Sequence, residues 1–190
     1  MRIITFDIET IPPPGETKFE TMTQLITVVG IHDSLTDSYE AFEVEEFPRL
    51  WKILEEADIL VGYNSDHFDI PILNKYYPGD LTKIKSLDLL KEIYTVLGRR
   101  IRLDSVAEGT LGTGKSGNGL EAQKWWYNGE KERVKKYCLK DVEITKRILD
   151  HALEKNQVRY KELGKVKELV LDTSKWLESD DTPLTHTLGF

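Results

Sequence analysis

The chain has 190 residues, of which 39% are hydrophobic and 31% are charged, and this composition is typical of a globular domain. It excludes collagen-like and disordered chains, and no apolar run approaches the roughly 18 residues of a membrane span. The 26 Lys and Arg against 33 Asp and Glu give a net charge of −7. A protein that binds nucleic acid through a broad basic face is usually basic overall, so either the partner is not nucleic acid or a local basic patch and bound cations provide the attraction.

The cysteine content and the first residues indicate the compartment. Cys138 is the single cysteine, which excludes an internal disulfide and a multi-cysteine zinc or iron–sulfur site. The N-terminal segment does not resemble a signal peptide, because the acidic Asp7 arrives early and no small-residue cleavage site follows an apolar stretch. We expect a protein of a reducing, cytoplasmic compartment with no membrane contact.

Hydrophobic periodicity predicts three strands followed by alternating helices and strands. The first strand ends before Pro12–Gly15, and the first helix has apolar residues at helical spacing. In chain order the predicted elements are strands over 2–8, 24–32 and 38–44, a helix over 46–56, a strand over 58–62, a helix over 69–77, and a strand over 84–87.

This order predicts an α/β fold whose mixed sheet combines an antiparallel meander with parallel strands, flanked by helices. A long helix is predicted over 131–153, because apolar residues recur there on one face. Residues 160–190 are polar, and we expect a peripheral helix anchored by Trp176, then a frayed end. We therefore divide the chain into a domain over 1–155 and a helical extension with a tail over 156–190.

Acidic residues interrupt segments that otherwise look buried. Asp7 and Glu9 stand at i and i+2 of the first strand, so both point to the same face, where their charges repel unless a cation or proton lies between them. Taken alone, the pair also fits a solvent-facing strand end. Asp69 follows Asn64 after the fourth strand, where capping of the next helix is the simpler interpretation.

The third acid lies on the long helix. Tyr137 and Asp141 are four residues apart and share its apolar face, where an acid needs a partner, either a lysine or a metal ion. Considered together, the four carboxylates would converge on hard divalent cations such as Mg²⁺. Two such ions can hold the attacking and leaving oxygens of a phosphoryl displacement.

The three segments resemble the Exo I, II and III motifs of the DEDD superfamily of 3′–5′ exonucleases, which have the ribonuclease H-like fold. The matching residues are Phe6-Asp7-Ile8-Glu9-Thr10, Asn64-x-x-x-Phe68-Asp69 and Tyr137-x-x-x-Asp141, the last in its tyrosine form. The chain is most similar to the stand-alone YprB-like domains, which are related to the proofreading domain of family B DNA polymerases. The resemblance covers about residues 1–150.

The resemblance implies a role for each matching residue. Asp7, Glu9, Asp69 and Asp141 would hold two divalent cations, Mg²⁺ or Mn²⁺, and Tyr137 would orient the attacking water. Thr10 and Asn64 would lie near the terminal nucleotide. The implied substrate is the 3′ end of single-stranded DNA or RNA, and the implied setting includes a larger replication, repair or RNA-processing complex.

Two further lysines are candidates for contact with the phosphate backbone. Lys115 belongs to Gly109-x-x-x-x-Gly114-Lys115-Ser116, which matches a P-loop by its letters. That motif needs a strand before it and a helix directly after it, whereas a helix is predicted over 103–108 and a loop afterwards. Lys136 belongs to a basic run over 131–140, for which a solvated helix face is an equally good interpretation.

Trp125, Trp126 and Tyr127 are aromatic residues that could stack on bases, but core packing of some rings with others half exposed is the favoured interpretation. The sequence thus predicts a metal-dependent 3′–5′ exonuclease that releases nucleoside 5′-monophosphates. The alternatives are a non-catalytic nucleic-acid- or partner-binding module on the same fold, and an endonuclease.

Overall fold

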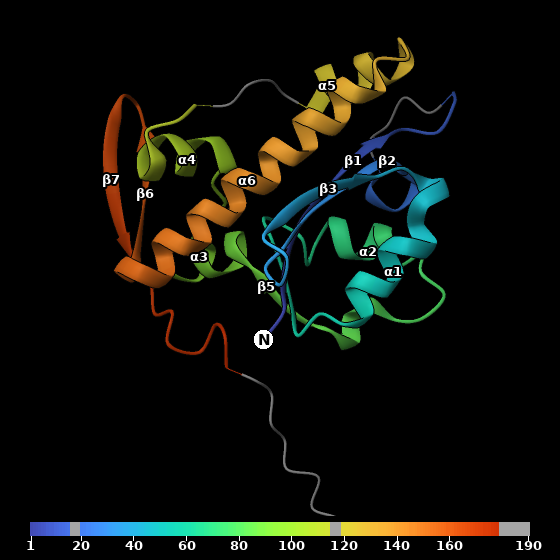
Figure 1. Cartoon of the computed structure of the whole chain (residues 1–190). Helices are drawn as coiled ribbons and strands as arrows, with labels where there is room; N and C mark the ends of the chain where they lie inside the picture. Colours follow the sequence, from blue (N-terminus) through green and yellow to red (C-terminus); the bar gives the residue numbers. More distant parts are fainter. Residues whose placement is uncertain (16–19, 115–118, 179–190) are drawn as a thin grey trace, which may run out of the picture.

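A computed structural model describes residues 1–15, 20–114 and 119–178 of the chain. Five of its strands form a mixed sheet in the order β3-β2-β1-β4-β5 (Figure 1). The pairs β1–β2 and β2–β3 are antiparallel, whereas β1–β4 and β4–β5 are parallel, as predicted. The strands are β1 (Ile3–Ile11), β2 (Leu25–Asp33), β3 (Ser38–Phe42), β4 (Ile59–Gly62) and β5 (Lys85–Asp88).

Helices cover both faces of this sheet. The long helix α6 crosses one face, and α1 and α2 pack on the opposite face (Figure 1). The helix α2 is shorter than the predicted 69–77. The helices are α1 (Phe47–Glu55), α2 (Asp69–Leu73), α3 (Leu89–Leu97), α4 (Leu103–Leu111), α5 (Gly119–Tyr127) and α6 (Lys131–Lys155), with short 3₁₀ turns at Thr21–Thr23, Val44–Glu46 and Leu81–Lys83.

The central strand β1 separates two environments because successive side chains of a strand point to opposite faces. Ile4, Phe6 and Ile8 are buried in the apolar cluster that includes residues of α1 and α2. Asp7 and Glu9 therefore point to the other face, which α6 covers. The alternation of β1 thus delivers two carboxylates to the interface between the sheet and the long helix.

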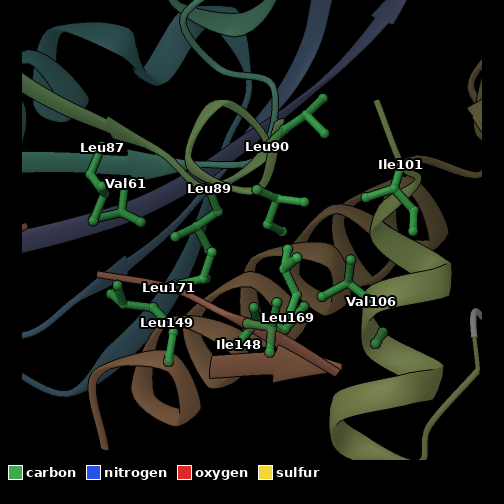
Figure 2. Close-up of a cluster of buried hydrophobic side chains, with 14 of the residues drawn as sticks. Val61, Leu87, Leu89, Leu90, Ile101, Val106, Ile148, Leu149, Leu169 and Leu171 are labelled. Carbon is green, nitrogen blue, oxygen red and sulfur yellow. The ribbon is translucent and has the colours of Figure 1, made fainter. Parts of the chain in front are cut away.

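A second apolar cluster fills the other side, between the strands β4 and β5 and the helices α3, α4 and α6. Figure 2 shows Val61 and Leu87 of the sheet facing Ile148 and Leu149 of α6. Ile101, in the segment between α3 and α4, also points into this cluster and is 9% exposed. The segment is therefore anchored at Ile101, with the exposed Arg100 and Arg102 on either side.

The C-terminal part differs from the prediction of a peripheral helix. It forms a β-hairpin of β6 (Gln157–Glu162) and β7 (Lys165–Val170), which begins after Asn156 ends α6 in the left-handed conformation. Burial alternates along β6, where Val158 and Tyr160 are buried in the second cluster. This alternation has the period of a strand, so the segment belongs to the core and is not a peripheral extension.

Two glycines allow close approaches that hold these layers together. A Cβ at Gly109 of α4 would lie 2.5 Å from the Cα of Tyr160, so α4 rests directly on the backbone of β6. A Cβ at Gly30 of β2 would lie 2.9 Å from the Sγ of Cys138 on α6. Gly30 is the register partner of Asp7. The absence of a side chain at Gly30 therefore lets α6 lie close to the acidic stretch of β1.

In the ranges that the structure describes, no helix is both long and apolar enough to cross a membrane.

Candidate active site

Three carboxylates from two elements meet between the sheet and α6. Asp7 and Glu9 come from β1, and Asp141 comes from the buried face of α6. One carboxylate oxygen from each lies within 4.8 Å of the corresponding oxygens of the other two. The spacing of i and i+2 on a strand against one face of a helix brings the three together, although 132 residues separate Glu9 from Asp141.

The fourth predicted acid approaches from the second parallel connection. Asp69 is the first residue of α2 and is 5% exposed. Its Oδ1 accepts a hydrogen bond from the backbone N–H of Ile8 at 3.2 Å. Phe68, and not Asp69, stands at the N-cap of α2, so the interpretation of Asp69 as the capping residue is wrong. Asp69 is fixed against β1 through its hydrogen bond with Ile8, the residue between Asp7 and Glu9.

All four acids and Tyr137 line one open cavity of about 550 Å³. Thr10 and Asn64 line it as well, which places both residues expected near the terminal nucleotide beside the acids. The remaining lining comes from loops and helix ends, including Tyr63, Phe68, Arg102, Asp104, Leu120 and Gln123.

Burial and like charges shift the pKa values of these groups in one direction. Burial raises the pKa of Asp7 well above its ordinary value, and the carboxylates of Asp69, Asp141 and Glu9 raise it further. Burial raises the pKa of Asp69 to about 7, although the N–H of Ile8 opposes this shift. These carboxyl groups thus carry a negative charge at a cost that a bound cation would relieve.

Tyr137 lies at the edge of the acidic cluster and is 4% exposed. Burial, the charge of Asp141 and the charge of Glu9 raise the pKa of its hydroxyl. The phenol is therefore protonated at neutral pH and can donate a hydrogen bond. Its ring packs edge-on against Trp125 of α5, with centroids 5.8 Å apart.

Cys138 of α6 is fully buried and also contacts the site. Its Sγ lies 3.4 Å from the backbone oxygen of Asp7 and 3.7 Å from Oδ2 of the same residue. Burial and the charge of Asp7 raise the pKa of the thiol well above its ordinary value. The thiol therefore stays protonated and acts as a weak donor to Asp7.

The loop that carries Asn64 is held by Asp88 at the end of β5. One carboxylate oxygen of Asp88 accepts the N–H of Asn64 at 2.7 Å and that of Leu90 at 2.9 Å, and the other accepts the N–H of Asp66 at 3.1 Å. Asn64 adopts a positive φ of 71°, a conformation that asparagine tolerates better than most residues. Asp88 thus caps α3 and fixes the loop that leads to Asp69.

Of the two lysines predicted to contact phosphate, Lys136 does not line the acidic cavity. Lys115 lies outside the described residues. Lys136 is exposed and lines a separate hollow with Gly129, Lys131 and Arg133. Other members of the basic run are ion-paired, since Glu43 pairs with both Lys131 and Lys135. A mostly neutralised helix face therefore describes this run better than a continuous phosphate track.

The other two sequence features have structural explanations. The segment before the P-loop match is α4, which extends through Gly109 to Leu111, so the strand that a P-loop requires is replaced by a helix. Trp125 and Trp126 are partly buried and pack against the small cluster that includes Val28 and Val134. Tyr127 is 62% exposed. The packing interpretation of these aromatic residues is thus confirmed.

The mixed five-stranded sheet, flanked by helices on both faces, defines the ribonuclease H-like class of α/β domains. The chain belongs to the RNase H superfamily, whose family model matches residues 4–153. Proteins with this fold are generally nucleases. No curated protein is similar enough in sequence to count as a relative.

A solved structure with a similar fold is the family B DNA polymerase from the hyperthermophilic archaeon Pyrobaculum calidifontis. The TM-score is 0.59 and the sequence identity is 20%, so the likeness is one of fold. The match covers 80% of this chain and 24% of the polymerase chain. The chain therefore corresponds to about a quarter of that protein, in agreement with the resemblance to family B polymerases found in the sequence motifs.

Proposed function

We propose that this protein is a metal-dependent 3′–5′ exonuclease that hydrolyses single-stranded DNA or RNA and releases nucleoside 5′-monophosphates. The observation that carries the proposal is the meeting of Asp7, Glu9 and Asp141 within 4.8 Å, in a cavity that Asp69 and Tyr137 also line. Membership of the RNase H superfamily supports the nuclease class. The resemblance of the three motifs to those of the DEDD 3′–5′ exonucleases supports the 3′–5′ polarity.

The donor set fits divalent cations of the hard type. All four acidic residues offer carboxylate oxygens, which Mg²⁺ and Mn²⁺ prefer as ligands. The raised pKa of Asp7 reflects accumulated negative charge that such cations would neutralise. Asp7, Glu9, Asp69 and Asp141 would hold the ions. When bound, the ions would lower the pKa of a coordinated water and stabilise charge on the phosphate.

Other residues that line the cavity would orient the attacking water and contact the substrate. Tyr137, whose protonated hydroxyl donates a hydrogen bond to the carboxylate of Asp141 one turn later, would orient the attacking water by accepting a hydrogen bond from it. Asn64 and Thr10, which line the same cavity, would contact the terminal nucleotide. Arg102, at the same cavity, would face the phosphate backbone as a fixed positive charge.

The direct test is incubation of 5′-labelled single-stranded DNA and RNA oligonucleotides with the protein and Mn²⁺. We expect a ladder that shortens from the 3′ end and disappears in EDTA and in the Asp7→Ala variant. The better-cleaved oligonucleotide identifies the preferred sugar. Cleavage of a closed circular substrate would instead identify an endonuclease.

A calorimetric titration separates the enzyme from a binding module. We expect Mn²⁺ to bind the wild-type protein and to lose affinity in Asp7→Ala. A folded protein that binds single strands but neither binds Mn²⁺ nor cleaves any strand would be a module on the same fold, and the proposal would be wrong.

A further inference from the structure

A second, smaller cavity adjoins the acidic one on the far side of Asn64. It has a volume of about 210 Å³ and lies between the loop after β4 and the first turns of α3. Its wall includes Leu90, Lys91 and Tyr94 of α3, together with Arg100 from the segment before α4. The acids Asp66 and Asp88 line it too, and both are engaged, since Asp66 pairs with Lys91 and Asp88 accepts backbone N–H groups. Asn64 lines both cavities, so the two spaces share one wall and follow one another along the surface.

Two arginines flank this shared wall. Arg100 lines the small cavity and Arg102 lines the acidic one, while Ile101 between them points into the core (Figure 2). The hydroxyl of Tyr63 donates a hydrogen bond to the backbone oxygen of Ile101 at 2.8 Å, which fixes the segment against the loop that carries Asn64.

Arg100 and Arg102 differ from the neighbouring cations because neither has an ion-pair partner among the described residues. In the described ranges neither Arg100 nor Arg102 forms an ion pair, and Arg100 donates a hydrogen bond to Oδ1 of Asn64. The neighbouring Arg99 is paired with Glu162, and Lys91 is paired with Asp66. The protein has a net charge of −7, yet Arg100 and Arg102, on either side of Ile101, form no ion pair among the described residues. We read this charge beside the acidic cavity as a sign of an anionic ligand that spans both spaces.

The small cavity also has an aromatic wall. Tyr94 is 50% exposed on α3, and Leu90 beside it is buried at 6%. A half-exposed ring above an apolar floor matches the faces of a nucleobase, which stacks on aromatic side chains without regard to sequence. The cavity thus offers a ring for a base and a guanidinium for a phosphate within one wall.

We propose that the small cavity is a subsite for the second nucleotide of a single strand, with its base against Tyr94 and its phosphate on Arg100. This inference rests on the proposed function, in which the terminal nucleotide occupies the acidic cavity. The strand would pass Asn64 between the two spaces, and Arg102 would remain with the terminal nucleotide. The enzyme would therefore prefer substrates that have at least two nucleotides.

The test compares two substrates that differ in whether they fill this subsite. The p-nitrophenyl ester of thymidine 5′-monophosphate supplies one nucleotide only, and a single-stranded oligonucleotide supplies the second. For Arg100→Ala we expect the ratio of kcat/KM for the oligonucleotide to that for the ester to fall about tenfold. For Tyr94→Ala we expect a fall of about fivefold or more, which Tyr94→Phe restores because it keeps the ring.

Arg99→Ala is the matched control, because it removes the same charge from the preceding residue, which lines neither cavity. Its ratio should stay within twofold of the wild-type value. Salt dependence gives a second measurement. Loss of one phosphate contact should reduce the slope of log affinity against log salt concentration by about 0.7 for Arg100→Ala and leave it unchanged for Arg99→Ala.

The outcomes separate this inference from the proposed function. If both substrates are hydrolysed and the ratio is the same in Arg100→Ala and wild type, the subsite is wrong and the exonuclease stands. If neither substrate is hydrolysed, the proposed function is wrong, and the anisotropy of a labelled single strand tests the subsite by itself. A tenfold weaker affinity in Arg100→Ala than in Arg99→Ala would then support it, and equal affinities would overturn it.

Discussion

Two buried carboxylates of the same sheet, Asp33 and Asp7, have opposite electrostatic surroundings. Asp33 at the end of β2 binds the guanidinium of Arg2 through two contacts, with Nη2 at 2.6 Å and Nε at 3.2 Å, and this pair lowers its pKa. Asp7, on the neighbouring strand, faces three carboxylates, which add to burial in raising its pKa. The first acid is satisfied within the chain, whereas the second retains charge that a ligand from outside would balance.

The largest expected effect is on catalysis at Asp7. Asp7→Asn keeps the shape of the side chain and removes its charge, so cation binding should weaken and the rate of strand cleavage should fall at least about 1,000-fold. The rate is measured with the labelled oligonucleotide. Asp33→Asn is the control and should cleave at close to the wild-type rate. Equal loss in both variants would show that the difference between the two acids is not functional.

Tyr137→Phe tests the member of the site that carries no charge. The variant keeps the ring that packs on Trp125 and loses the hydroxyl, so the rate should fall about 10- to 100-fold through lost positioning of the water. Calorimetry should find Mn²⁺ affinity within a few-fold of wild type. A strong loss of Mn²⁺ affinity would contradict an orienting role.

Asp33→Asn should show its effect on stability. Removing one charge of a nearly buried, doubly bonded ion pair should lower the free energy of unfolding by about 2 kcal/mol, measured by urea denaturation at pH 7. Glu56→Gln removes the other, 71% exposed partner of Arg2 and should cost less than about 1 kcal/mol. Because the pKa of Asp33 is lowered in the fold, its contribution is present above pH ~4 and is lost as the pH falls further.

The last expected effect is on the free energy of unfolding of the metal-free protein, which we expect a substitution of Asp7 to raise. Because the pKa of Asp7 is raised in the fold, its ionisation destabilises the protein at every pH above about 4. Without metal, Asp7→Asn should be more stable than wild type by about 1–2 kcal/mol at pH 8. The advantage should shrink toward pH 5, where Asp7 and Asp69 take up protons. An advantage that grows toward pH 5 would reverse our account of this site.

The parts of the fold that were predicted correctly depend on local periodicity. The succession of five strands along the chain and the face of α6 that carries Asp141 follow from apolar spacing. The hairpin over 157–170 was missed because most of β7 is exposed, so its polar sequence resembles a solvated helix. Only the contact with α4 and the second apolar cluster reveals why it is a strand pair.

The candidate site shows the same limit. The acids could be predicted because charges on buried elements are conspicuous in a sequence. Arg100 and Arg102 could not be assigned to a site, because exposed arginines are common and only the anchoring of Ile101 places them at the two cavities. The hydrogen bonds by which Asp88 holds the Asn64 loop depend on a strand end and a turn that meet only in three dimensions.

The geometry of the candidate site depends on Gly30, a residue that has no side chain. A methyl at this position would lie 2.9 Å from the Sγ of Cys138 and 3.2 Å from Cγ2 of Val142, so these side chains of α6 would have to shift. A displacement of α6 that relieved this contact would carry Tyr137 and Asp141 away from Asp7 and Glu9. A homologue could thus keep all four acidic residues and still lose the proposed nuclease activity because of one alanine in β2. To recognise such inactive homologues, the residue of β2 that is paired with Asp7 has to be examined together with the motifs.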